Sequence, residues 1–301
     1  LEAGALLGRS VDRVEWAGMC GQLGFEPPED VISRAVSAGL LWPTASGWRF
    51  QHGTLRDALL LESENENRLA DLHRSIADFL SAQTDNDLGN ELRCGEHLLA
   101  AGDHHIAFEI LLKAEALARE SRNDLAAERA IELADQAAQG LSSDRLSQHN
   151  LSLQQRKADL LRLKGEWDEA ERVARDLESL AEEMGENEPF VLALRIQAQC
   201  AFEHANYEQA SDLALRAQVV AQDVDNIEQA IHCELLLGMI FGAQSQWDRA
   251  VTFYQAALRR INNHCPQNHE LQGECLFHLG IIHKERGELS KALPLFIKSL
   301  Q

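Results

Sequence analysis

Small and large apolar residues follow a long, regular period along the second half of the chain. One series of small residues is spaced by 40, 40 and 42 positions: Ala170, Ala210, Ala250 and Ala292. A second series precedes it by twelve positions each time: Ala158, Ala198, Gly238 and Gly280. Self-similarity at such a period is the signature of stacked helix pairs, because one pair cannot bury its apolar stripe alone.

The stretch from residue 235 to residue 258, LLLGMIFGAQSQWDRAVTFYQAAL, shows one of these units most clearly. Its small residues, Gly238 and Ala250, mark where two helices touch. Its large residues, including Phe241 and Tyr254, recur at helical spacing and fill the space between the helices. The break at Ser245-Gln246-Trp247 has counterparts in the other units, where a small residue is followed two positions later by a large apolar one.

These positions resemble tetratricopeptide repeats (TPRs), whose motif has Leu-Gly in helix A, Gly at the turn, and Ala, an aromatic residue and Ala in helix B. The last unit matches through these residues: Leu279, Gly280, Gly287, Ala292 and Phe296. The third unit matches well, and the first two are degenerate. The resemblance covers about half of the chain and implies an all-α, right-handed TPR-like helical solenoid over residues 151–301, ending within a repeat.

Two features depart from the TPR motif. The period is longer than the usual length of about 34 residues, which predicts longer helices. Glu234 and Gln154 stand where a large apolar residue is usual, which predicts a weaker register in their helices.

Residues 1–60 predict a separate, small domain. Helical patterns occupy three segments: Leu1–Leu7, Val11–Leu23 and Glu29–Ala38. Apolar residues then flank the turn-rich segment Pro43–Gly47, which predicts a β-hairpin. Three helices followed by a hairpin is the plan of a winged-helix domain. Residues 61–150 are expected to supply linking helices and atypical first repeats.

The segments FQHGTLRDAL, from Phe50 to Leu59, and RLADLHRSIA, from Arg68 to Ala77, resemble the region that follows the ATPase core in STAND-type signalling ATPases. That family includes bacterial regulators and kinase–ATPase–TPR proteins. The resemblance covers roughly residues 1–120 and implies a P-loop ATPase domain upstream of this chain. The chain itself contains no GxxxxGK(S/T) motif, begins at Leu1 and stops within a repeat, so we expect a fragment of a longer protein.

The net charge of −20 argues against nucleic acid as a partner, because phosphate binding needs clustered Lys and Arg. The third helix of the winged-helix segment carries one cation, Arg34. A basic or neutral partner surface suits the chain better. Six cysteines without a CxxC pair are typical of a reducing compartment and predict a cytoplasmic protein. No signal peptide or long apolar run occurs, so no membrane interaction is expected.

No catalytic constellation stands out, so no enzyme activity or cofactor is expected from these residues. The densest metal-like cluster is His264, Cys265, His269, Cys275, His278 and His283. It lacks a CxxC anchor, and Cys275 and His278 fall inside an expected helix. We therefore favour ordinary packing over a zinc site. His52 and His73 are likewise expected to pack or cap helices.

The TPR resemblance implies that the A helices line a concave groove. Carried over to this chain, the inward positions begin with Gln155 and Asp159, and the predicted partner-binding groove then consists of Arg162, Arg195, Gln199, Phe202, His232, Leu235, Met239, Phe277, Ile281 and Lys284. The face becomes more apolar toward the C-terminal end. Its apolar side chains either anchor a partner or pack on a following repeat, and the sequence leaves both interpretations open.

The sequence therefore predicts a non-catalytic interaction or sensor module of a STAND-type regulator, which binds a protein or peptide partner. Two alternatives are a DNA-binding regulator that acts through the winged helix and a free-standing TPR adaptor or chaperone scaffold. The pattern predicts no particular oligomeric state.

Overall fold

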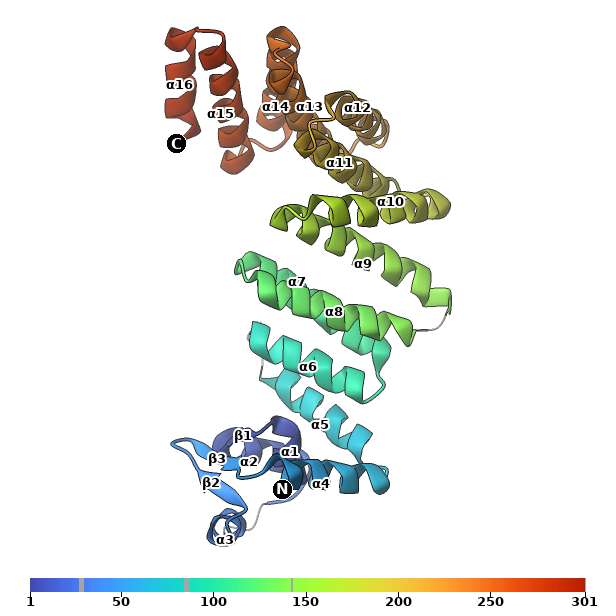
Figure 1. Ribbon diagram of the computed structural model, residues 1–301, viewed down its shortest axis with the longest axis vertical. Helices are drawn as coiled ribbons and strands as arrows, with labels where there is room; N and C mark the ends of the chain where they lie inside the picture. Colours follow the sequence, from blue (N-terminus) through green and yellow to red (C-terminus); the bar gives the residue numbers. More distant parts are fainter. Residues whose placement is uncertain (27–29, 84–86, 142, 301) are drawn as a thin grey trace. The chain divides into compact units, whose positions relative to one another are not determined.

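The computed structural model describes residues 1–26, 30–83, 87–141 and 143–300, which form two compact units, Leu1–Leu146 and Ser147–Gln301 (Figure 1). Both units consist largely of α-helices, which confirms the expected helical-repeat architecture. None of the described helices is both long enough and apolar enough to cross a membrane.

Unit 1 begins with short helices around a three-stranded antiparallel sheet. Its first elements are α1 (Glu2–Leu7), β1 (Ser10–Asp12), α2 (Arg13–Gln22), α3 (Val31–Ser37), β2 (Leu41–Pro43), β3 (Gly47–Phe50) and α4 (Gly53–Asn65). The strand order is β1-β3-β2, with Val11 opposite Trp48 and Leu41 opposite Phe50. Trp16 meets Trp48 edge-on, with ring centroids 4.8 Å apart, at the centre of an apolar core.

The sequence predicted the hairpin formed by β2 and β3 but missed β1. The second helix was expected to start at Val11, whereas it starts at Arg13. The cause is Asp12, whose Oδ1 accepts hydrogen bonds from the backbone N–H groups of Val14 (2.8 Å) and Glu15 (3.1 Å). This cap fixes the helix start, so Val11 stays extended and pairs with β3. The expected start of the third helix at Glu29 lies outside the described residues.

The rest of unit 1 is a run of helices that begins beside α1, α2 and α4: α5 (Leu69–Ala82), α6 (Leu88–Ala100), α7 (His104–Glu120) and α8 (Asp124–Gln139). Two arginines fix its start. Arg56 Nε of α4 donates to the carbonyl oxygen of Ala5 at 2.8 Å, and Arg68 binds the carboxylate of Glu2 at 2.7 and 3.1 Å. Both contacts tie the chain around α4 and α5 back to α1.

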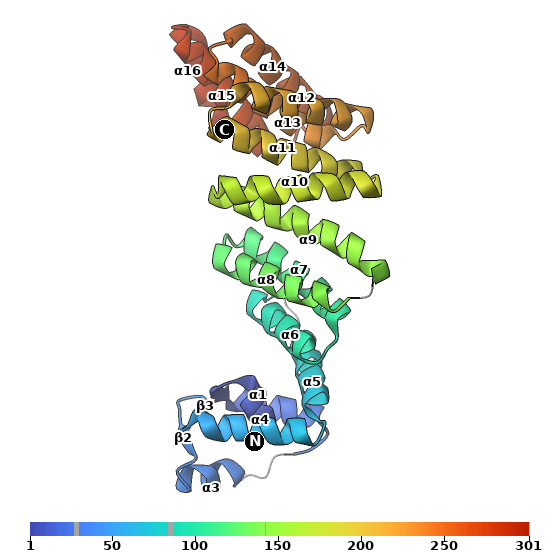
Figure 2. The same cartoon turned by 45° about the vertical axis from the view of Figure 1, so that its right-hand side comes forward.

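Unit 2 is a stack of antiparallel helices: α9 (Ser143–Lys164, mostly within this unit), α10 (Trp167–Met184), α11 (Asn187–Glu203), α12 (Tyr207–Asp223), α13 (Ile227–Ala243), α14 (Trp247–His264), α15 (His269–Glu285) and α16 (Leu289–Ser299). From α10 to α15 each helix has 17 or 18 residues, which confirms the prediction of long helices. Consecutive helices from α10 onward contact one another, as the two views show (Figures 1 and 2).

Apart from the turn between α14 and α15, the turns of unit 2 share one backbone feature, a single residue in the left-handed conformation. These residues are Gly165, Gly185, Ala205, Asp225, Ser245 and Gly287, with φ between 53° and 78°. The small residue that marked each turn in the sequence is this left-handed residue. Short side chains occur at these positions, although any residue other than glycine has a higher conformational free energy in the left-handed region.

Replacing Ala205 or Ser245 with glycine is therefore expected to stabilise unit 2. The gain should be about 0.5 kcal/mol at each site, because relief of the left-handed backbone outweighs the added entropy of the unfolded chain. Urea unfolding would measure it. The control, Ala256→Gly within α14, should lose about 1 kcal/mol instead. Equal losses at all three sites would contradict the role of the turns.

The two helices of a pair meet through a small residue on one and a matched residue sixteen positions later on the other. An added Cβ on Gly95, Gly238 or Gly280 would lie 2.4, 2.6 or 2.8 Å from Leu111, Tyr254 or Phe296, respectively. In the two degenerate units the same positions hold alanine on both helices: Ala158 with Ala174, and Ala198 with Ala214. A glycine on one helix faces a large side chain on the other, or an alanine faces an alanine, so the space between the two helices stays filled.

Glu234 does not weaken its helix as expected. Its side chain is only 2% exposed, yet Arg260 of α14 satisfies it through Nη2–Oε1 and Nε–Oε2 contacts of 2.8 and 3.3 Å. A charged residue is retained at this buried position because the neighbouring helix supplies its counter-ion.

Candidate partner-binding site on the A helices of unit 2

Charged and polar side chains from the first helix of each pair come together in unit 2. The first helices, α9, α11, α13 and α15, are the A helices, and α11 and α15 both contact α13. We define the A-helix face by five side chains: Arg162 on α9, Arg195 and Gln199 on α11, His232 on α13 and Glu274 on α15. The charges of Arg162 and Arg195 lie near enough to His232 and Glu274 to lower the pKa values of both.

Arg162 is neutralised within its own helix. Its Nη2 and Nε atoms lie 2.8 and 2.9 Å from Oδ1 of Asp159, one helical turn earlier. The side chains of both residues are largely buried. This ion pair leaves the positive charge of Arg195 as the less compensated one on the A-helix face.

Arg195 is the least satisfied group of this face. Its Nε atom is buried and has no hydrogen-bond partner, and no ion pair within the described residues engages its guanidinium. Burial lowers the pKa of Arg195, and the nearby charge of Arg162 lowers it further. A buried cationic donor without a partner costs free energy, so the position is suited to an anionic or carbonyl group supplied from outside.

His232 lies beside this arginine on the next A helix. Burial lowers the pKa of His232 to about 4, and the positive charges of Arg195 and Arg162 contribute in the same direction, against a smaller opposing effect of Asp159. The imidazole is therefore neutral at pH 7. A neutral imidazole can donate one hydrogen bond and accept another, which suits a polar ligand group.

The lowered pKa of His232 makes stability depend on pH. The unfolded chain binds a proton at His232 near its ordinary pKa of about 6.5, whereas the folded chain does so only near pH 4. Stability should fall as pH drops from about 6.5 to about 4, because the unfolded state takes up the proton first. In His232→Gln, the free energy of unfolding should decrease less steeply with falling pH, by roughly 1 kcal/mol per pH unit. Chemical denaturation at pH 7, 5.5 and 4.5 measures it, and an unchanged slope would show that His232 is not buried this way.

The other predicted groove residues are distributed unevenly. Leu235 is 3% exposed and belongs to the same apolar core as Leu271 and Cys275 of α15. Phe277 is 47% exposed and tilts against Phe296, with ring centroids 5.7 Å apart. The remaining positions are half-buried or exposed: Gln199, Phe202, Met239, Ile281 and Lys284. Phe202 contacts Tyr207 at 5.8 Å, and Lys284 pairs with Glu285 at 3.1 Å.

Sequence reasoning missed the acidic part of this face. Glu274 stands six positions before Gly280, as His232 stands six before Gly238, and Glu270 and Glu228 share the offset of ten. Burial raises the pKa of Glu274, the charge of Glu270 raises it further, and Arg162 and Arg195 oppose both. Comparing equivalent positions of successive repeats would have found these residues.

The metal-like cluster of the sequence is not drawn together around one point. Cys275 Sγ donates to the backbone oxygen of Tyr254 at 3.1 Å, and His278 stacks on the Tyr254 ring at 5.8 Å. His283 Nδ1 lies 2.7 Å from Oε2 of Glu288. Cys275, His278 and His283 thus each have a structural partner within unit 2. His73, for its part, contacts His97 across α5 and α6, with an Nδ1–Nδ1 distance of 2.8 Å.

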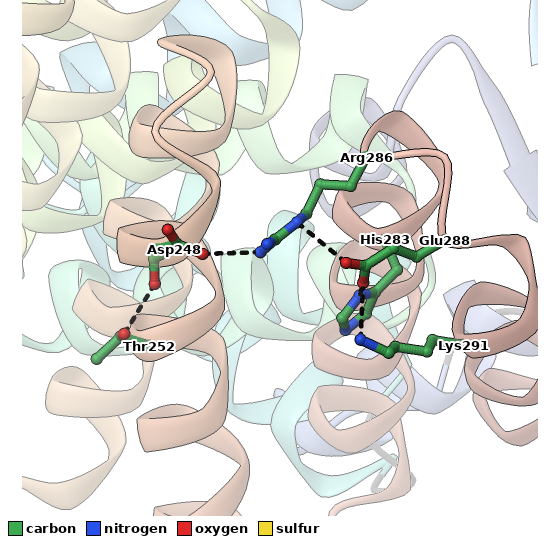
Figure 3. A network of polar contacts seen from close by, with 6 residues as sticks. All are labelled: Asp248, Thr252, His283, Arg286, Glu288 and Lys291. Carbon is green, nitrogen blue, oxygen red and sulfur yellow. Dashed lines mark hydrogen bonds and ion pairs between the residues drawn. The ribbon is translucent and has the colours of Figure 1, made fainter.

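His283 belongs to a polar network that joins the last three helices of unit 2 (Figure 3). Glu288, just before α16, also binds Lys291 at 3.1 Å and Arg286 at 3.5 Å, and Arg286 reaches Asp248 of α14 at 2.9 Å. The network links the turn between α15 and α16 to the start of α14.

Comparison with known proteins places the chain by fold alone. It matches no protein-family model and no curated protein. BtubC (BKLC) from P. vanneervenii is 18% identical, with a TM-score of 0.55 over 71% of this chain and 90% of that one. A STAND protein with a TPR sensor from Pyrococcus horikoshii is 14% identical, with a TM-score of 0.51 over 99% of this chain and 50% of that one. A Rap protein solved with Competence and Sporulation Factor is 13% identical, with a TM-score of 0.56 over 81% and 73%. The chain thus has the fold of TPR-like helical-repeat proteins.

Proposed function

We propose that the A-helix face of unit 2 binds a protein or peptide partner and that the chain acts as a non-catalytic interaction module. The observation that carries this proposal is the buried, unpartnered Nε of Arg195. Other buried charges of unit 2, such as Glu234, have counter-ions within the fold. Arg195 as a residue is only half-buried, so a ligand that contacts the accessible part of its side chain would supply an acceptor that the fold lacks.

The similar folds support a binding role. The Rap protein was solved as a complex with Competence and Sporulation Factor, and the STAND protein from Pyrococcus horikoshii has a tetratricopeptide repeat sensor. Repeats of this kind present continuous surfaces because each helix pair contacts only its neighbours. The same use of the A helices is proposed for this chain.

We further propose that residues 1–60 form a winged-helix domain that relays partner binding to other parts of a STAND-type regulator, with residues 61–150 as the link to the repeats at 151–301. The element order from α1 to β3 and the similarity to the STAND protein along 99% of this chain support this context. Arg34, on α3, lies 3.6 Å from Asp30, so its charge is neutralised locally. That pairing favours a relay over contact with DNA phosphates.

Partner binding is expected to depend on Arg195 and Phe277. A library of random displayed peptides, selected on the whole chain, should yield binders, because the face offers an unpaired donor and an exposed aromatic anchor. Arg195→Glu should lower the affinity of these peptides at least tenfold, since it replaces the donor with a repelling charge. Phe277→Ala should weaken them less. Calorimetry measures both effects.

The matched control is Arg259→Glu, because Arg259 is an exposed arginine on α14 with the same charge. This variant should bind like the wild type, and circular dichroism should show intact helices in all three variants. Peptides that bind all variants equally, or no enrichment at all, would overturn the proposed function.

A further inference from the structure

The A-helix face is ordered by charge from one side to the other. Arg162 and Arg195 lie on α9 and α11, and the neutral His232 follows on α13. On α15 the face carries Glu274, and Glu270 stands beside it one helical turn earlier. The two ends of the face therefore favour groups of opposite sign.

The acidic end, like the cationic end, has charged side chains without a partner of opposite sign. Glu270 and Glu274 lie four positions apart on one helix with solvent-accessible side chains, although neighbouring residues partly shield the carboxylate of Glu274, and like charges at this spacing repel. No ion pair within the described residues gives either of them a cationic partner. The charge of Glu270 raises the pKa of Glu274 after burial does. A cation placed between the two carboxylates would relieve this repulsion.

We propose that the ligand of the A-helix face is a peptide segment that presents a carboxylate to Arg195 and His232 and a basic side chain to Glu270 and Glu274, crossing from α11 to α15. This inference rests on the proposed function and adds to it the chemistry and the direction of the ligand. A chain of net charge −20 would repel a purely anionic ligand, whereas a peptide with one carboxylate and one basic group is close to neutral overall.

The geometry limits the spacing of the two ligand charges. α13 lies between α11 and α15 and contacts both. Packed helices are separated by about 8–10 Å, so two steps span at most about 20 Å. An extended peptide covers that distance in about four to six residues. The carboxylate and the basic group should therefore be separated by three to five intervening positions.

A carboxylate fits the cationic end better than a phosphate does. Arg162 already pairs with Asp159, and His232 is neutral, so Arg195 supplies roughly one unit of uncompensated charge. A phosphate group brings about −1.5 to −2 charges at pH 7 and would be undercompensated here. The carboxylate would accept from Arg195 and from the imidazole N–H of His232.

The test is a library of acetylated, amidated dodecapeptides in which one Asp and one Lys are the only charges, placed at every spacing and in both orders. Selected on the whole chain, one order should be enriched at least tenfold over the other, with a preferred separation of four to six residues. In Arg195→Gln, peptide enrichment should no longer depend on the position of Asp, but should still depend on the position of Lys. In the double variant Glu270→Gln/Glu274→Gln, enrichment should no longer depend on the position of Lys, but should still depend on the position of Asp. Arg259→Gln and Glu183→Gln, exposed residues on α14 and α10, serve as charge-matched controls.

A second readout uses His232 itself. Binding of the best peptide should raise the pKa of His232 from about 4, measured by NMR, because the carboxylate replaces a repelling environment with an attractive one. A peptide with Asn in place of Asp should leave it unchanged. Binding of both orders with equal affinity would overturn the charge order while the proposed function stands. Failure of every peptide, charged or neutral, to bind would overturn both.

Discussion

Gly238→Leu is expected to destabilise unit 2 by about 3 kcal/mol, the upper end of the usual cost of overpacking a core. A Cβ at this position would already lie 2.6 Å from the Tyr254 ring, and leucine adds three more carbon atoms. Tyr254 cannot yield easily, because it is 1% exposed and His278 of α15 stacks on it. Urea unfolding measures the loss, and a free energy of unfolding within about 0.5 kcal/mol of wild type would contradict this packing.

A double-mutant cycle separates the clash from other effects of the substitution. Gly238→Ala should destabilise the wild type, whereas in a Tyr254→Ala background the same change should be neutral or stabilising. That background recreates the alanine–alanine pairing of the two earlier repeats, and alanine gains about 1 kcal/mol over glycine in a helix. The same cost in both backgrounds would show that Gly238 and Tyr254 do not contact each other.

Arg260→Leu is expected to cost about 3 kcal/mol. It removes the counter-ion of Glu234 and leaves a carboxylate that is 2% exposed without its partner. The thermal midpoint of unit 2 should fall by several degrees. Arg259→Leu, at the adjacent exposed position of the same helix, controls for the loss of an arginine and should change little.

The double variant Glu234→Leu/Arg260→Leu should recover most of that loss. Replacing a whole buried ion pair with apolar groups is often neutral or stabilising, because both desolvation costs disappear together. Leucine is also close to the large apolar residue usual at this TPR position. A double variant as unstable as Arg260→Leu alone would show that the ion pair is needed for more than mutual compensation.

Much of the fold could be predicted from the sequence because the same pattern of packing residues recurs in successive repeats. Gly238 and Gly280, each followed sixteen positions later by a large aromatic residue, define the contact between paired helices. The left-handed turn residues recur at the same offset. The chain cannot satisfy these constraints with helices of another length, so the pattern determines helix bounds and order.

The elements that sequence reasoning missed depend on single contacts rather than on repetition. β1 has three residues, too few for alternation to appear, and it exists because Asp12 caps the next helix. Glu234 looked like a defect until its partner Arg260, 26 positions away, was known. Leu235 and Phe277 share one repeat position, yet only Phe277 is exposed, because burial depends on the neighbouring helices.

Part of the candidate site followed from the repeat, and its electrostatics did not. Arg162, Arg195 and His232 were predicted by their positions on the A helices, and they do lie close together. That Asp159 neutralises Arg162 while Arg195 stays unpaired depends on side-chain geometry. No periodic pattern encodes which of two arginines has a partner.

Site-specific photo-crosslinking tests the central claim most directly. A benzophenone side chain is placed at Gln199, on α11 beside Arg195, or at Gln255, an exposed position on α14. Peptides selected on the whole chain are added, and the crosslinked product is quantified for each position. Binding at the A-helix face predicts crosslinking from residue 199, lost with Arg195→Glu, and little from residue 255. Crosslinking from residue 255 alone, or from residue 199 at an undiminished level in Arg195→Glu, would contradict it.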